Sequence, residues 1–108
     1  LDMERVGGLD SAQRGYASAL RRWPDNLLAL GGLGNTAYAL GDYAASESAF
    51  RAALALAPDE AGLWNNLAYA LARQGQRQAS LAAVGQALAL DPENADYQAS
   101  RLELNGLE

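Results

Sequence analysis

The chain lacks the side chains on which most enzyme chemistry depends. Its 108 residues include no cysteine, no histidine and no lysine, so all 8 basic residues are arginines. These absences remove the usual general base, the thiol nucleophile and the amine that forms Schiff bases. They also exclude a disulfide framework. We therefore expect a protein that is not an enzyme and that carries no cofactor.

Acidic residues are the remaining candidates for catalysis or metal binding. The nearest clusters are Asp59 with Glu60, and Asp91 with Glu93. Both clusters lie at expected helix starts, where carboxylates cap the helix and meet the positive end of its dipole. Asp96 adds a further oxygen to the second cluster, but the glycine and the spacing of a calcium loop are absent. The sequence therefore predicts no catalytic residue and no metal site.

Charge and hydropathy restrict the partners. The net charge is −5, and a chain that neutralises phosphates needs a basic face instead. No apolar run approaches the roughly 18–20 residues that span a bilayer. We expect no nucleic-acid binding and no direct membrane insertion. The alanine- and arginine-rich composition suggests a soluble bacterial protein, of the cytoplasm or the periplasm, and the sequence does not choose between these compartments.

Alanine and leucine are abundant, and both favour helices. Pro24, Pro58 and Pro92 are each 34 residues apart, and Gly41 and Gly75 divide the intervals between them. The apolar period within each interval is helical. A recurrence of this length indicates a stack of similar units. We therefore predict an all-α chain of helix–turn–helix repeats.

The expected helices follow from the apolar period and from capping residues. Gly7 and Gly8 are expected to break the chain before the first clear helix. The expected caps, in chain order, are Asp10 or Ser11, Asp25 or Asn26, Asp42, and Glu93 or Asn94. The predicted helices run over about 9–22, 27–40, 43–56, 60–73, 77–90 and 95–104.

This pattern resembles the tetratricopeptide repeat (TPR) family, whose units are 34-residue pairs of antiparallel helices. The resemblance rests on residues that recur in register: Leu30 and Trp64, Leu33-Gly34 and Leu67-Ala68, Gly41 and Gly75, Phe50 and Val84, Ala53 and Ala87. It implies a right-handed α-solenoid of helix hairpins. It divides a single domain, 1–106, into the second half of a repeat (9–26), full repeats (27–60 and 61–94) and a capping helix (95–104). Residues 107–108 are interpreted as a cloning scar.

Several residues depart from the family's pattern. Ser46 and Ser80 stand where alanine is usual, and Arg77 replaces a packing aromatic. In the family, a small residue at the position of Gly34 allows two helices to pack closely. No such role is expected for Gly31 or Gly32. Since each glycine inside a helix costs about 0.5–1 kcal/mol relative to alanine, we predict that the helix over 27–40 is the softest.

The last helix has the character of a cap. Gln98 and Arg101 stand where the earlier units carry large apolar residues. Its remaining apolar face, Ala95, Ala99 and Leu102, suits packing on one side only. A terminal helix with a polar outer face keeps a solenoid soluble.

In TPR proteins the first helix of each unit lines a groove that holds an extended peptide or a helix of a partner. The resemblance places the peptide-binding groove at Asn35, Tyr38, Asn65, Asn66, Tyr69 and Arg73. Leu28, Gly31, Ala72, Asp96, Ala99 and Glu103 extend this surface. An asparagine amide can bind a peptide backbone, a tyrosine offers flat apolar surface, and an arginine can bind a carboxylate. The alternative is that these are ordinary residues of a solvated face, with the tyrosines packed between helices.

A comparison with chaperone-binding members of the family restricts the kinds of peptide that we expect this chain to bind. Chaperone-binding members of the family hold a C-terminal carboxylate with two basic residues, where this chain has Asp96 and Ser100. The sequence therefore disfavours an acidic C-terminal peptide and favours a neutral or partly basic partner.

Self-association is the alternative role. Tyr16 and Leu20 form an apolar edge on the first clear helix, through which a homodimer could form. The repeats could equally serve as a scaffold within a larger bacterial protein, attached to a separate catalytic or envelope domain.

Overall fold

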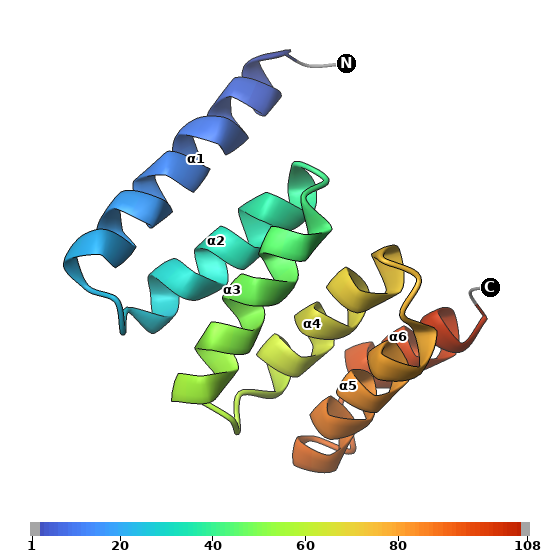
Figure 1. Ribbon diagram of the computed structural model, residues 1–108. Helices are drawn as coiled ribbons and strands as arrows, with labels where there is room; N and C mark the ends of the chain where they lie inside the picture. Colours follow the sequence, from blue (N-terminus) through green and yellow to red (C-terminus); the bar gives the residue numbers. More distant parts are fainter. Residues whose placement is uncertain (1–2, 107–108) are drawn as a thin grey trace.

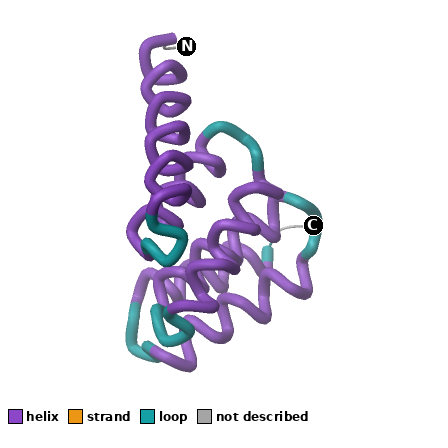
Figure 2. The backbone as a smooth tube through the Cα atoms, turned by 60° about the vertical axis from the view of Figure 1, so that its left-hand side comes forward, coloured by secondary structure: helices purple, strands orange, loops and turns teal. Residues whose placement is uncertain are grey.

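The computed structural model describes residues 3–106, and this part of the chain consists of helices joined by short loops, without a strand (Figure 2). Glycine or proline in each loop explains why the helices end where they do. The helices, in order, are α1 (Met3–Arg22), α2 (Leu27–Ala39), α3 (Tyr43–Leu56), α4 (Ala61–Arg73), α5 (Arg77–Leu90) and α6 (Ala95–Asn105).

Consecutive helices pack as antiparallel hairpins, and the hairpins are stacked along the chain (Figure 1). Helices α2, α4 and α6 also contact one another directly, as α2 with α4 and α4 with α6. Within the described residues α1, α3 and α5 make no such contacts with each other. The stack is thus drawn together on the side of α2, α4 and α6, which is the concave side of the solenoid. The predicted all-α solenoid is confirmed.

Helix α1 begins earlier than predicted. It runs without interruption from Met3 through Gly7 and Gly8, so the expected break there is wrong, and Asp10 and Ser11 lie inside the helix rather than at its cap. Glycine makes a helix less stable but does not forbid helical backbone angles. The two glycines that do take a positive φ are Gly41 (86°) and Gly75 (77°).

Side chains cap the starts of α2, α3 and α6. Asn26 Oδ1 accepts a hydrogen bond from the Ala29 backbone N–H at 3.1 Å, and Asp42 Oδ1 accepts one from Ala45 at 3.1 Å. Asn94 Oδ1 accepts from two backbone N–H groups at the start of α6. The cap of α2 is therefore Asn26 and not Asp25, and the cap of α6 is Asn94 and not Glu93. Glu60 precedes α4 but makes no capping hydrogen bond.

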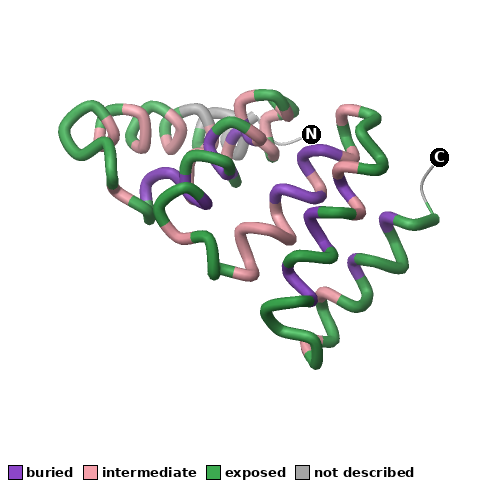
Figure 3. The backbone as a smooth tube through the Cα atoms, turned by 60° about the horizontal axis from the view of Figure 1, so that its bottom comes forward, coloured by how far each residue is buried: buried purple, intermediate pink, exposed green. Residues whose placement is uncertain are grey.

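Buried residues occur on α2 to α6 (Figure 3), and a core cluster joins α3, α4, α5 and α6. The largest buried side chain of this cluster is Phe50, and its other buried members are Leu54, Leu67, Ala68, Leu71, Ala83, Val84 and Leu104. By contrast, none of the α1 side chains that the structure describes is fully buried.

Two glycines of α2 make room for aromatic rings. A Cβ on Gly34 would lie 2.6 Å from the Phe50 ring, as the family pattern implied. A Cβ on Gly32 would collide with the Tyr16 ring. The prediction that Gly32 has no packing role is therefore wrong, because α1 lays its tyrosine across that position. Gly31 faces open space, as expected.

The two serines that depart from the family pattern perform the same task in successive repeats. Ser46 Oγ donates to the Gly34 carbonyl at 2.8 Å, and Ser80 Oγ donates to the Ala68 carbonyl at 2.7 Å. Both serines are fully buried. Each one fastens the second helix of a unit to the first helix of the same unit.

Helix α6 packs through a different face from the one predicted. Ser100 and Leu104 are its buried residues, whereas Leu102 is 74% exposed and Ala95 and Ala99 are also exposed. The predicted face was wrong because Leu104 packs into the core on the side of α4 and α5, and this rotation of α6 leaves Leu102 exposed.

Arg77 compensates for the missing aromatic at the start of α5. Its guanidinium donates to the backbone carbonyl and the side-chain oxygen of Asn105, at the end of α6. A cation at this place also meets the negative end of the helix dipole.

Candidate functional site

A pocket of about 300 Å³ opens on the concave face between α2 and α4. Asn35 and Tyr38 reach it from α2, and Asn66 and Tyr69 reach it from α4. The Phe50 ring closes its floor. The spacing of three residues within each helix aims these pairs in one direction, so four of the six predicted groove residues meet in one place.

Two amides bridge the helices at this pocket. Asn66 Nδ2 donates to Asn35 Oδ1 at 3.3 Å. Each amide carries two donor hydrogens and one acceptor oxygen. The contact uses a single group from each, so a donor of Asn35 and the acceptor of Asn66 remain available, and neither has another partner among the described residues.

Arg73 joins this surface through Tyr38. Its Nε donates to the Tyr38 hydroxyl at 3.0 Å, and its guanidinium carbon lies 5.9 Å from the ring centroids of both Tyr38 and Tyr43. The hydrogen bond to Tyr38 and the nearby phenol rings raise the pKa of Arg73 further above its usual value. An arginine is charged at any physiological pH, and this cation lies close to two aromatic rings.

Tyr69 ties α4 to α6. Its hydroxyl donates to Glu103 Oε2 at 2.7 Å and lies 3.2 Å from Ser100 Oγ. Burial raises the pKa of the Tyr69 phenol, and the neighbouring Glu103 carboxylate adds to the rise. The phenol therefore keeps its proton and holds a carboxylate on the concave face. Sequence reasoning placed Glu103 at the edge of the groove but not this pairing, which depends on how α6 is turned.

A second hollow of about 440 Å³ continues the groove toward α1. Asn35 lines both hollows, so the two adjoin at this residue. The second is mainly apolar and is lined by Tyr16, Leu27, Leu28, Gly31, Gly32, Glu60 and Leu63, besides Asn35. Leu28 is 82% exposed.

Besides Arg73, which bonds to Tyr38, Asn65 is the predicted groove residue that lines neither hollow. It is half-buried, and its Oδ1 is buried without a hydrogen-bond partner among the described residues. Its part in binding stays a prediction.

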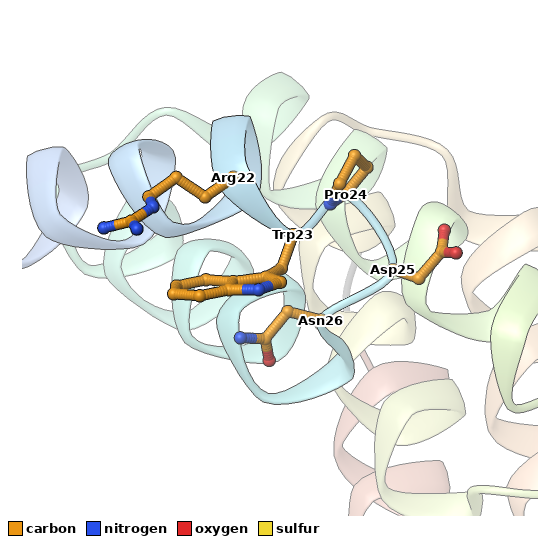
Figure 4. A pocket seen from close by; sticks show the side chains of 5 residues that line it. All are labelled: Arg22, Trp23, Pro24, Asp25 and Asn26. Carbon is orange, nitrogen blue, oxygen red and sulfur yellow. The ribbon is translucent and has the colours of Figure 1, made fainter.

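The loop between α1 and α2 forms another hollow, of about 660 Å³, which the sequence analysis did not single out (Figure 4). Trp23 lies 56% exposed in it, and the Arg22 guanidinium carbon is 4.9 Å from the indole centroid. The signal was available, since the following units carry Ala57 and Asp91 at the position of Trp23. The last residue of α1 and the four loop residues that follow it, 22–26, line this hollow, and none of them lines the two hollows of the groove.

In the described part of the chain, no helix is both long enough and apolar enough to cross a membrane. Among the described side chains, no three acidic residues lie where they could share a metal ion.

The sequence matches the tetratricopeptide repeat family over residues 4–61 and again over residues 32–95. These overlapping matches cover most of the chain. The chain belongs to the tetratricopeptide repeat family. TPR folds are typically non-catalytic scaffolds for protein interaction, so the chain is a protein-interaction module.

Solved structures agree with this fold. An O-GlcNAc transferase mutant of Thermobaculum terrenum superposes with a TM-score of 0.83 at 29% identity, covering 94% of this chain and 19% of that one. MamA gives 0.85 at 26% identity, covering 95% of this chain and 61% of that one. The first TPR of Spaghetti (RPAP3), bound to the HSP90 peptide SRMEEVD, gives 0.86 at 18% identity, covering 94% and 80%.

This TPR chain therefore spans about a fifth of the transferase and about three fifths of MamA. No curated protein sequence matches it. The likeness to the transferase concerns the TPR fold, and no feature of the described residues points to transferase chemistry.

Proposed function

We propose that the concave groove of this TPR chain binds an extended segment of a partner protein. The observation that carries the proposal is the amide pair Asn35–Asn66, which lies in the pocket with a donor and an acceptor still available. An extended peptide has unpaired backbone N–H and C=O groups that match them, whereas the backbone groups of a helix are already paired. Support also comes from RPAP3, whose TPR fold holds a peptide.

Chemical-shift mapping with isotope-labelled protein tests the proposal. Peptides selected from a random display library should shift the backbone amides of α2, α4 and α6. The outer helices α3 and α5 serve as the internal control. Shifts confined to α3 and α5, or to the Trp23 loop, would place the binding surface elsewhere.

Self-association or scaffolding within a longer protein is the second candidate. The observation in its favour is that α1 packs only on α2 within the described residues, unlike α3 and α5, which each pack on two helices. Sedimentation across a wide concentration range tests self-association. A dimer that Leu20→Ser dissociates would support the α1 edge as its interface, and a monomer at all concentrations would exclude it.

A further inference from the structure

We infer that the segment bound in this groove carries a large apolar residue toward α1 and a basic residue toward α6. This inference rests on the proposed function, because it names the chemistry of the partner at the same groove. It follows from the different character of the two ends of the concave surface and from the charge between them.

The α1 end provides a socket for an apolar side chain. The hollow there is lined by Tyr16, Leu28 and Leu63, and Gly31 forms an open place in its wall. A Cβ added at Gly31 would meet no atom within 4 Å. Leu28 is 82% exposed, so an apolar side chain that enters covers surface that water now contacts.

The middle of the groove can form hydrogen bonds with the peptide backbone of the bound segment. Asn35 belongs to both hollows, and its amide is paired with Asn66. A segment anchored at Gly31 and continuing toward α6 therefore passes over the two amides, which can bind any sequence through its peptide groups.

The α6 end is acidic. Glu103 is held on the concave side by the Tyr69 hydroxyl at 2.7 Å, and Asp96 lies two turns earlier on the same side of the helix. Glu60 lies at the other end of the groove, where it lines the apolar hollow. Among the described residues argued to form this surface, these three carboxylates outnumber the one guanidinium, that of Arg73, whose Nε donates to Tyr38. The groove therefore carries net negative charge and complements a basic segment.

The expected spacing follows from the fold. Packed helices lie about 8–10 Å apart, so α2 and α6, separated by α4, lie about 20 Å apart. An extended chain covers about 3.3 Å per residue. The apolar and basic residues should therefore be about five or six positions apart.

Selection of random dodecapeptides on phage against the immobilised full chain tests the inference. The enriched sequences are synthesised with a fluorophore, and their dissociation constants are measured by anisotropy. Gly31→Leu fills the socket, and its matched control is Gly85→Leu, at an exposed position of α5 that is equally open. Glu103→Gln removes the charge but keeps an acceptor for Tyr69, and its control is Glu93→Gln in the exposed α5–α6 loop. Circular dichroism establishes that each variant is folded.

The expected result is enrichment of an apolar residue and an arginine or lysine at the stated spacing. Gly31→Leu should weaken such peptides about tenfold, since burial of one large apolar side chain is lost. Glu103→Gln should weaken them about threefold, an effect that high salt removes. Both controls should stay within about twofold of the unmodified chain.

The alternative outcomes separate the two proposals. Acidic or unbiased peptides that still lose affinity in Gly31→Leu or Asn66→Ala would overturn this inference and leave the groove as the binding site. Peptides insensitive to every groove variant, or no enrichment at all, would overturn both.

Discussion

Single glycines have opposite roles within one helix. In α2, Gly34 is required because the Phe50 ring lies against it, whereas Gly31 meets no neighbour. We expect Gly31→Ala to raise the free energy of unfolding by about 0.5–1 kcal/mol, because alanine is the better helix former. Gly85→Ala, at an equally open position, should give the same gain. Chemical denaturation measures both, and a loss of stability in Gly31→Ala would show that its space is occupied.

Gly34→Ala provides the contrasting case. Its Cβ would lie 2.6 Å from the Phe50 ring, and inserting a methyl group into a packed core typically costs about 1–3 kcal/mol. The same denaturation experiment should show this loss. A stability equal to that of the unmodified chain would mean that Phe50 can move aside.

The side chain of Asn65 is expected to lower the stability of the fold, whereas that of its neighbour Asn66 is not. Its buried Oδ1 has no donor among the described residues, and an unsatisfied buried acceptor costs about 1–3 kcal/mol. We expect Asn65→Ala to leave the melting temperature unchanged or to raise it. Asn66→Ala is the control, since it also removes a hydrogen bond to Asn35. A clear drop in Asn65→Ala would reveal a partner for that oxygen.

Among the helices, α3 and α4 are joined by a cluster that should respond to pH. Gln74 Nε2 donates to Glu47 Oε1 at 3.0 Å, and Glu47 Oε2 lies 2.7 Å from Arg51 Nε. The hydrogen bond from Arg51 lowers the pKa of Glu47 below its usual 4.5, against the opposing effect of burial, and Gln74 adds to the lowering. A carboxyl with a lowered pKa stabilises the fold above that usual value and loses its contribution as the pH falls.

We therefore expect the unmodified chain to lose stability on acidification below pH 4.5 more steeply than Glu47→Gln does. Urea denaturation between about pH 6 and about pH 3 measures the difference. Asp59→Asn, in the exposed loop before α4, serves as the control. Parallel curves for Glu47→Gln and the unmodified chain would contradict the prediction.

Helices should also differ in how often they open. The described side chains of α1 include no buried residue, and α1 packs on one helix, whereas α4 and α5 carry most of the core. Local stability follows buried contacts. Backbone amides should therefore exchange with solvent fastest in α1, and not in α2 as the glycines alone predicted; exchange should be slower in α2 and slowest in α4 and α5. Mass spectrometry after timed deuteration measures this order, and slow exchange throughout α1 would refute it.

The sequence predicted helix boundaries best where a turn glycine precedes the helix and a proline follows it. Helices α3 and α5 begin and end as expected, because Gly41 and Gly75 supply the positive φ before them and Pro58 and Pro92 follow them. The start of α1 was not predictable in this way, since a glycine permits a turn without requiring one. Likewise, the burial of Leu104 instead of Leu102 depends on the rotation of α6 against the core.

At the scale of the whole molecule, the register of the 34-residue repeat was enough to predict most of the residues that lie on the concave surface. Five of the six predicted groove residues lie on it or bond to it, because a 34-residue repeat returns equivalent helix faces to one side. The pairings across it, such as Tyr69 with Glu103 and Arg73 with Tyr38, could not be predicted. They depend on the twist between units, which no local pattern specifies.

The serine hydrogen bonds of Ser46 and Ser80 have a consequence for how the chain folds. Each bond closes a loop of only 12 residues within its own unit, so its entropic cost is small. A unit can thus form from neighbouring residues and serve as the template for the next, as expected of a one-dimensional array. Folding should be fast, and it should begin in the hairpin of α4 and α5 and spread outward to both ends.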